Sequence, residues 1–239
     1  MRENAVTAMK LTVPELLDRL EANFGPQEPC WPLDPYLFLV WWHCGYPAGD
    51  ATCQRGWNAL KSKIGIAPQD LLRASQAKLA AALKAGGMVP EERAARLQEI
   101  AGRVVNEFGG NLRESLAGPM RDVRRLLKSF PGIADPGADR ILLFGNCAPV
   151  AAIPSNCPHV LARIQGRPEQ DYGKTYREAQ SRIEAEVPAQ FAARQRAFLL
   201  LKEHGQSICK RAKPKCESCP VSGHCGYFAG RNRDSTCID

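Results

Sequence analysis

Four cysteines lie close together near the C-terminal end of the chain and restrict what this sequence can fold into. They are Cys209, Cys216, Cys219 and Cys225, with the spacing C-x6-C-x2-C-x5-C. Thiolates are soft ligands, and four of them around one centre suit either zinc or an iron–sulfur cluster. Structural zinc sites usually combine two C-x2-C pairs, and this segment contains only one. The wider gaps favour a [4Fe-4S] cluster, whose four iron corners must each be reached.

A cationic loop separates the first two of these cysteines. It carries Lys210, Arg211, Lys213 and Lys215, in a chain whose 32 Lys and Arg residues exceed its 25 Asp and Glu residues. A positive loop held at both ends suits the phosphate oxygens of nucleic acid. The same cations would also offset the negative charge of a cluster bound by thiolates. Because four cations exceed what local neutralisation requires, we favour contact with nucleic acid.

The composition is that of a folded protein. The chain has 239 residues, of which 44% are hydrophobic and 24% charged, enough for one large domain or two smaller ones. No stretch approaches about 18 uninterrupted apolar residues, and no apolar signal region follows Met1, so we expect neither a membrane span nor secretion. We therefore expect a cytoplasmic protein, associated with the nucleoid if bacterial. In a reducing compartment its ten cysteines are not expected to form a disulfide framework.

Apolar residues recur at helical spacing along most of the sequence, and few segments alternate like strands. Asp34 before Pro35 is typical of a helix start, and Gly65 and Gly109 are typical of helix ends. We therefore predict the all-α fold class. The predicted helices are 35–42, 51–64, 67–85, 90–108, 120–129, 138–144, 160–164, 176–186 and 188–204.

The cysteine spacing resembles the iron–sulfur loop of the endonuclease III family of DNA glycosylases. The approach to it, Val-Pro-Ala-Gln-Phe at 187–191 followed by His204-Gly205, is similar as well. Phe-Pro-Gly-Ile at 130–133, followed by Ala138-Asp139, resembles the helix-hairpin-helix element of that family. The resemblance runs in register over most of the chain after residue 30.

This resemblance implies two helical lobes with a DNA-binding cleft between them. One lobe is a six-helix barrel-type domain with the helix-hairpin-helix, and the other is the iron–sulfur cluster domain. We expect residues 1–48 to pack with the iron–sulfur domain, 49–149 to form the six-helix domain and 150–239 to form the C-terminal iron–sulfur domain. The resemblance also implies a [4Fe-4S] cluster, and a monomer that binds damaged or distorted double-stranded DNA.

Two residues that carry the family chemistry are replaced by proline. Family enzymes extrude a nucleotide and break its glycosidic bond with the help of a carboxylate, and bifunctional members add a hairpin lysine that forms a Schiff base. In register, Pro136 takes the lysine position and Pro154 the carboxylate position. Proline carries neither an amine nor a carboxylate on its side chain, so lyase chemistry from residue 136 is excluded. Residues 145–163 contain no Asp or Glu at all.

The hairpin itself is altered. In the family it presents a Gly-hydrophobe-Gly turn whose backbone N–H groups hold a phosphate, which makes Gly132 a candidate DNA contact. Here Ala134 replaces the second glycine, the acid Asp135 would repel phosphate, and Pro136 lacks an N–H donor.

Residues 35–50 resemble the helix that forms one wall of the family's substrate pocket. The candidate pocket residues are Trp42, His43, Tyr46 and Pro47. Pro47 falls where relatives carry a glutamine that fills the gap left by the extruded base. Trp42 falls near a catalytic glutamate of the adenine-removing branch. His43 and Tyr46 could line the pocket or donate a proton, although aromatic residues on an apolar helix more often belong to the core.

Asp50, Asp135 and Asp139 are the nearest carboxylates in the family frame and the candidates for a relocated catalytic acid. Each also has a structural interpretation, which we prefer. Asp139 lies early in the second hairpin helix, where an acid favours the helix dipole, and Asp135 is suited to cap that helix.

Two functions remain nearly balanced. The first is recognition of damaged bases in base excision repair by a monofunctional DNA N-glycosylase without efficient Schiff-base lyase activity. The second is a non-catalytic DNA-binding module that senses damage or redox state. The intact family frame favours the first, and the replaced catalytic and wedge residues favour the second.

Overall fold

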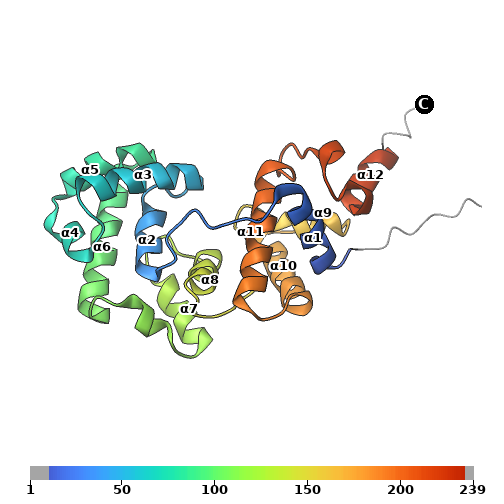
Figure 1. The fold of residues 1–239 in the computed structure, drawn as a ribbon. Helices are drawn as coiled ribbons and strands as arrows, with labels where there is room; N and C mark the ends of the chain where they lie inside the picture. Colours follow the sequence, from blue (N-terminus) through green and yellow to red (C-terminus); the bar gives the residue numbers. More distant parts are fainter. Residues whose placement is uncertain (1–10, 235–239) are drawn as a thin grey trace, which may run out of the picture. The chain divides into compact units, whose positions relative to one another are not determined.

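A computed structural model describes residues 11–234 of the chain. Within this range there are twelve α-helices, four short 3-10 helices and no strand, which confirms the predicted all-α fold class (Figure 1). No helix between residues 11 and 234 combines the length and apolar character that a membrane crossing requires. The described residues form two compact units: a terminal unit (11–28 with 149–234) and a central unit (29–148).

The central unit is built around two helices, α6 and α2. Its helices are α2 (Pro35–His43), α3 (Asp50–Lys63), α4 (Pro68–Arg73), α5 (Gln76–Leu83), α6 (Pro90–Phe108), α7 (Met120–Lys128) and α8 (Asp135–Phe144), with 3-10 turns at Lys84–Gly86 and Leu112–Leu116. Helices α4 and α5 pack on α6, while α2 contacts α3, α6 and α8 (Figure 1).

Helix α2 is buried on nearly every side, as its apolar sequence predicts. Phe38, Leu39, Val40 and Trp41 are at most 1% exposed, and each such side chain contributes about 1.5–3 kcal/mol through burial. The helix begins as predicted: the Asp34 carboxylate accepts a hydrogen bond from the Leu37 N–H at 3.0 Å. Helix α2 therefore forms the centre of this unit.

The prediction of a single helix over residues 67–85 was wrong, because the structure has two helices in this segment. Ala74 is extended, and the Ser75 hydroxyl accepts a hydrogen bond from the Lys78 N–H and so starts a new helix. Serine competes for backbone donors in this way, which favours a cap over a helix interior. Helices α4 and α5 are the result.

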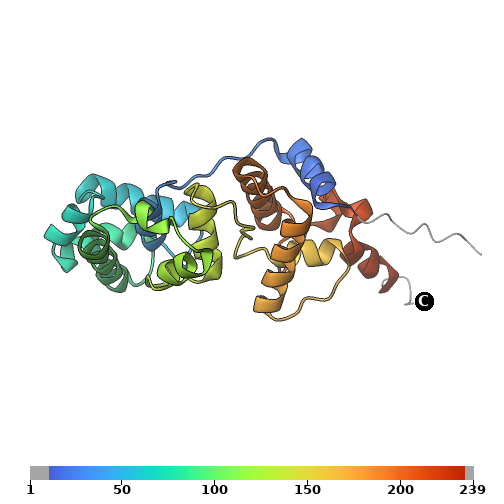
Figure 2. The same cartoon turned by 90° about the horizontal axis from the view of Figure 1, so that it is seen from below.

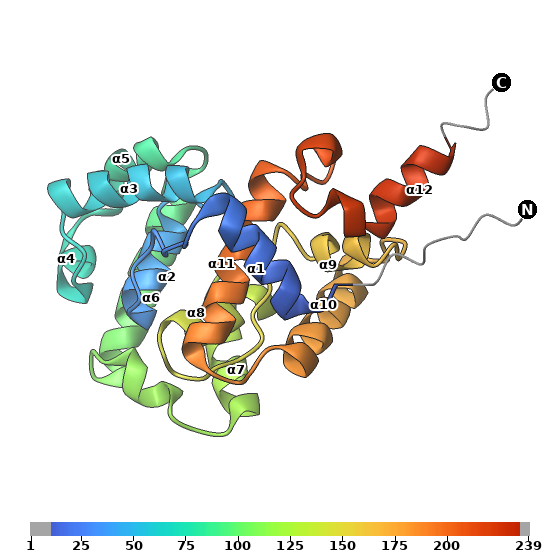
Figure 3. The same cartoon turned by 45° about the vertical axis from the view of Figure 1, so that its right-hand side comes forward.

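The terminal unit joins the two ends of the described chain. Its helices are α1 (Val13–Phe24), α9 (His159–Ile164), α10 (Tyr172–Glu186), α11 (Phe191–Ser207) and α12 (Gly226–Asp234), with 3-10 turns at Cys216–Ser218 and Ser222–His224. Helix α1 lies along α11 (Figure 2), and Leu16 and Leu20 share a buried core with Ala197 and Leu200. Helix α9 contacts both α10 and α12 (Figure 3).

Helix α12 begins directly against the end of α9. The backbones of Gly166 and Gly226 approach so closely that a Cβ on Gly226 would lie 2.7 Å from the Gly166 backbone. Only glycine allows this approach. The cysteine segment that precedes α12 is thereby held against α9.

The grouping of α2 bears on the expected domain organisation. Helix α2 packs inside the central unit, whereas the sequence analysis grouped residues 1–48 with the iron–sulfur domain. Compact units are defined by contacts between residues, which differ from domains defined by family resemblance. The expected domain bounds 1–48, 49–149 and 150–239 therefore stay a prediction.

Candidate nucleic-acid interface and cysteine centre

The hairpin between α7 and α8 is held against α2. Gly132 has a φ of +66°, in the left-handed region, and a Cβ on it would lie 3.2 Å from Cε1 of His43. Nε2 of His43 donates a hydrogen bond to the Pro131 carbonyl at 2.9 Å. The left-handed backbone therefore favours glycine at position 132, and the imidazole packed on it leaves little room for a Cβ.

His43 holds the hairpin as a neutral imidazole. It is 1% exposed, and burial lowers its pKa to about 4, helped by Arg96 and Arg93 and opposed by the hydrogen bond to Pro131. A buried histidine with this pKa is uncharged near neutral pH. The geometry therefore makes His43 a positioning residue for the hairpin.

The other candidate pocket residues lie at the C-terminal end of α2 and just after it. Trp42 is 8% exposed and stacks on Tyr46 with ring centroids 4.3 Å apart at 20°. It also stacks on Phe38 at 5.8 Å. Tyr46 is partly buried and Pro47 is exposed. The indole of Trp42 is thus packed between neighbouring rings of its own unit.

Asp50 is paired with a buried arginine that the sequence analysis missed. The Arg140 guanidinium lies 3.5 Å from the Asp50 carboxylate, and its Cζ lies 3.7 Å from the centroid of the Trp31 ring. The Arg140 side chain is 8% exposed, so this cation is neutralised by Asp50 and stabilised by aromatic rings. No local pattern predicts such a contact, because 90 residues separate its partners.

The two hairpin carboxylates are each paired with a cation of α7. Asp139 is 1% exposed, and its Oδ1 accepts a hydrogen bond from Nε of Arg124 at 2.9 Å. Asp135 is the first residue of α8 and lies 2.7 Å from Nζ of Lys128. The Asp135 side chain is 59% exposed, against 19% for Asp50 and 2% for Asp139. Asp135 is therefore the most accessible of the three candidate acids.

Both prolines at the altered positions fit their local structure. Pro136 is the second residue of α8, where its missing N–H costs the helix nothing. Pro154 is buried, and its carbonyl accepts a hydrogen bond from the Cys157 N–H at 2.9 Å. These positions offer neither an amine nor a carboxylate.

All four cysteines predicted as ligands line one cavity of the terminal unit: Cys209, Cys216, Cys219 and Cys225. Val221 and Phe228 contribute apolar walls. Two guanidinium groups reach the sulfurs: Arg163 Nη1 lies 4.0 Å from Cys209 Sγ, and Arg231 Nη1 lies 3.6 Å from Cys216 Sγ. Such cations favour the thiolate form that binds metal.

The cysteine cavity brings four sulfur ligands to one place. Among residues 11–234, no group of three or more His, Cys, Asp or Glu side chains is arranged to hold a metal ion. A tetrahedral zinc site would need four sulfurs at about 2.3 Å from one point, whereas a cluster is bound at its four separate corners. Burial also raises the pKa of Cys219 to about 11, so its thiolate needs positive charge nearby. The donor set therefore suits a [4Fe-4S] cluster, which stays a prediction.

The cationic loop is exposed, and its backbone is fixed. Lys210, Arg211, Lys213 and Lys215 all have exposed side chains. Arg163 donates hydrogen bonds to the carbonyls of Lys210 at 3.0 Å and Arg211 at 2.8 Å. The Lys215 N–H donates to the Ile208 carbonyl at 3.0 Å. Arg211 also forms an ion pair with Glu169 at 3.3 Å. The loop therefore presents its cations from a fixed backbone.

Arg163 is a second residue whose role the sequence analysis missed. It is buried, and it binds the loop backbone, Glu169 and the Cys209 sulfur at once. It lies in the helix predicted over residues 160–164, where a charged residue in a mainly apolar segment is a signal that could have drawn attention to it. Its partner on the loop lies 47 residues away, and no sequence pattern connects the two.

Known proteins are similar to this chain in sequence and in fold. No family model matches it. The chain is 27% identical to endonuclease III of Thermotoga maritima over 166 residues, covering 70% of this chain and 71% of that protein. It is 25% identical to the thymine/uracil-DNA glycosylase of Methanothermobacter thermautotrophicus over 161 residues, or 67% of each.

Solved structures share the fold. A non-covalent endonuclease III–DNA complex superposes with a TM-score of 0.73 at 19% identity, covering 93% of this chain and 99% of that one. A thermostable thymine-DNA glycosylase superposes with a TM-score of 0.71 at 21% identity, covering 91% and 97%. The expected all-α fold is thus shared with both.

Proposed function

We propose that the chain is a member of the endonuclease III superfamily of helix-hairpin-helix proteins, that it binds double-stranded DNA and that it acts as a DNA glycosylase in base excision repair. The relatives named above are endonucleases and glycosylases, and one structural neighbour is a complex with DNA. The observation in this chain that carries the proposal is the cationic loop. Four exposed cations on a backbone fixed by Arg163 suit the phosphates of a nucleic-acid strand.

The proposed reaction is hydrolysis of the N-glycosidic bond of a damaged base, without strand cleavage. Pro136 supplies no amine for a Schiff base, so the abasic product should remain intact. Of the three candidate carboxylates, Asp135 is the most accessible, and we assign to it the stabilisation of the cationic sugar or the activation of water. Its ion pair with Lys128 would hold it at the start of α8 for either role.

The cofactor proposed for this function is a [4Fe-4S] cluster held by Cys209, Cys216, Cys219 and Cys225. Bound there, it would join both ends of the cationic loop to the start of α12 and provide a redox-capable centre. Arg163 and Arg231 would place positive charge beside its thiolates.

Duplexes with a single lesion test this proposal. Purified protein is incubated with DNA that contains uracil, thymine glycol, hypoxanthine, mismatched adenine or an alkylated purine, and half of each sample then receives hot alkali. We expect breaks only after alkali, from at least one lesion, and weaker breakage with Asp135→Asn. The exposed Asp122→Asn on α7 is the matched control, and its breakage should equal that of the unaltered protein. Breaks without alkali, with an adduct trapped by borohydride, would contradict the role assigned to Pro136.

The second candidate function is non-catalytic DNA binding. The observation that favours it is the pair of prolines at positions 136 and 154, which remove both family catalytic groups. Salt-sensitive binding to duplexes, with no break from any lesion after alkali, would support this function and exclude the first.

A further inference from the structure

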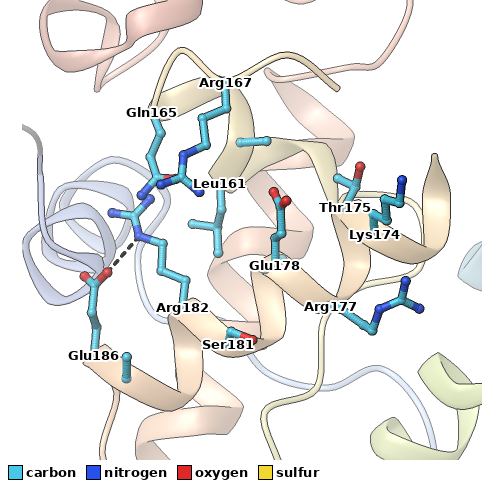
Figure 4. A pocket seen from close by; sticks show the side chains of 13 residues that line it. Leu161, Gln165, Arg167, Lys174, Thr175, Arg177, Glu178, Ser181, Arg182 and Glu186 are labelled. Carbon is cyan, nitrogen blue, oxygen red and sulfur yellow. Dashed lines mark hydrogen bonds and ion pairs between the residues drawn. The ribbon is translucent and has the colours of Figure 1, made fainter. Parts of the chain in front are cut away.

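A groove between α9 and α10 of the terminal unit is lined by cations that the proposed reaction does not use. Leu161 and Ala179 are buried residues of its lining, which also carries four positive side chains (Figure 4). They are Arg167, Lys174, Arg177 and Arg182. Glu178 and Glu186 are the acids in its lining, so the groove is positive on balance.

Arg182 has an unused donor in this groove. Its side chain is 10% exposed. Nε donates to Glu186 at 2.8 Å, and Nη2 donates to the Leu11 carbonyl at 2.7 Å. Nη1 is buried and has no hydrogen-bond partner. A buried donor on a charged group without a partner is unfavourable, so a ligand that accepts a hydrogen bond from Nη1 would relieve that cost.

A second guanidinium lies at the same end of the groove. Figure 4 shows the side chains of Arg167, Gln165 and Arg182 directed toward one another at that end. Arg167 is exposed, and none of its side-chain atoms takes part in an ion pair within the described residues. Two guanidinium groups and an amide that converge in this way match an oxyanion with several acceptor oxygens.

The acids of the groove limit the size of that anion. The Glu186 carboxylate is already occupied, because one oxygen accepts from Nε of Arg182 and the other accepts the Val13 N–H. Glu178 accepts a hydrogen bond from Gln170 at 2.7 Å and stands between the Arg167 end and the Lys174 end. Its charge would repel a second phosphate placed along the groove. The site therefore suits one phosphate group.

We propose that Arg167, Arg182 and Gln165 form a binding site for a single phosphate group. The group belongs either to a free phosphate compound or to one phosphodiester of a DNA strand. The second source rests on the proposed function, and the first does not. The site is separate from the cationic loop, whose cations do not line this groove.

Calorimetric titration of the full chain with inorganic phosphate at constant ionic strength tests the site. We expect saturable one-to-one binding, and binding about tenfold weaker in Arg167→Gln, because one charge-assisted pair is removed. Arg167→Gln alters an exposed side chain and should leave the fold intact. Arg182→Gln should weaken binding further, but it also removes the bonds to Leu11 and Glu186, so its melting temperature is measured beside it. Arg19→Gln, an equal charge loss on the exposed face of α1, is the matched control and should bind as the unaltered protein does.

The result decides both the site and its source. Absent phosphate binding, or equal binding in Arg167→Gln and the unaltered protein, overturns the site. If duplex affinity and its salt dependence also fall in Arg167→Gln, the phosphate belongs to DNA. If duplex affinity is unchanged while phosphate binding weakens, the ligand is a free phosphate compound. Phosphate binding in a protein that binds no duplex would reject the proposed function and retain the site.

Discussion

His43 joins two parts of the central unit that lie 88 residues apart, through one hydrogen bond to the Pro131 carbonyl. The neighbouring Gly132 leaves room for the imidazole. Neither residue needs to touch DNA to matter, since together they set the path of the hairpin. Replacing His43 tests the buried imidazole, and replacing Gly132 tests the backbone and the space beside it.

Acid should weaken the fold through His43. Its pKa of about 4 in the folded chain lies below the ordinary value of 6.5, so the unfolded chain binds the proton more readily. The stability due to the neutral imidazole is complete above about pH 6.5 and is lost as the pH falls toward 4, by about 3 kcal/mol. Urea unfolding at pH 7 and pH 4.5 should show this loss, and His43→Gln should reduce the difference between the two. Equal differences in both proteins would exclude His43 as the source.

Gly132→Ala should cost more stability than a glycine replacement that meets no neighbour. The left-handed backbone alone costs about 1 kcal/mol for alanine, and the contact with His43 adds to that at position 132. Gly109→Ala is the matched control, because its φ is +58° and nothing lies within 4 Å of the added Cβ. Unfolding free energies of the two variants give the comparison. If Gly109→Ala loses as much as Gly132→Ala, the imidazole contact contributes nothing.

At the scale of elements, helix α7 supports α8 through two ion pairs of very different burial. Arg124 meets the buried Asp139, and Lys128 meets the exposed Asp135. Removing the cation should lower the free energy of unfolding strongly in the buried pair and only slightly in the exposed pair.

Arg124→Leu should therefore destabilise the chain by about 3 kcal/mol, and Lys128→Leu by less than about 1 kcal/mol. Adding Asp139→Leu to Arg124→Leu should recover much of the stability, because no buried charge then remains. Chemical unfolding of the two single variants and the double variant measures these values. A double variant no more stable than Arg124→Leu would show that packing, rather than the loss of the Arg124 ion pair from the buried carboxylate, causes the destabilisation.

The cationic loop is the other element whose contribution can be isolated. Replacing Lys210, Arg211, Lys213 and Lys215 by alanine should weaken duplex binding and lower the slope of log affinity against log salt by about 0.9 for each DNA phosphate that the loop no longer neutralises. Lys61→Ala with Lys63→Ala, two exposed cations at the end of α3, serves as the control. Fluorescence anisotropy at several salt concentrations gives both quantities. An unchanged slope in the loop variant would remove these residues from the interface.

Local sequence signals predicted elements better than they predicted contacts. Asp34 starts α2 as expected, and Thr12 with Glu15 is a capping box that would have indicated α1, which the sequence analysis did not identify. The break at Ser75 was also local and was missed. The contacts of Arg140, Arg163 and His43 join residues 47 to 90 positions apart, and periodicity carries no information about such pairs. These contacts can be identified only from the folded structure.

At the scale of the whole molecule, we expect the full chain to carry the proposed [4Fe-4S] cluster in its terminal unit. Anaerobic preparations of the full chain should show a broad absorbance band at about 400 nm and about four irons per chain. Cys216→Ser, at the most buried of the four ligands, should abolish the band, whereas Cys147→Ser, outside the cysteine cavity, should leave it unchanged. Colourless protein that contains zinc would reject the cluster.

The glycine contact between the end of α9 and the start of α12 offers a way to disturb the cysteine segment without removing a thiol or a charge. A methyl group on Gly226 would collide with the backbone at Gly166, and Cys225 is the residue immediately before it. The two chain segments would have to part, carrying one thiol away from the other three. Gly226→Ala should therefore lower the iron content of the protein although all four cysteines remain. Iron lost in this variant would be lost because a ligand is displaced, and not because a thiolate is missing.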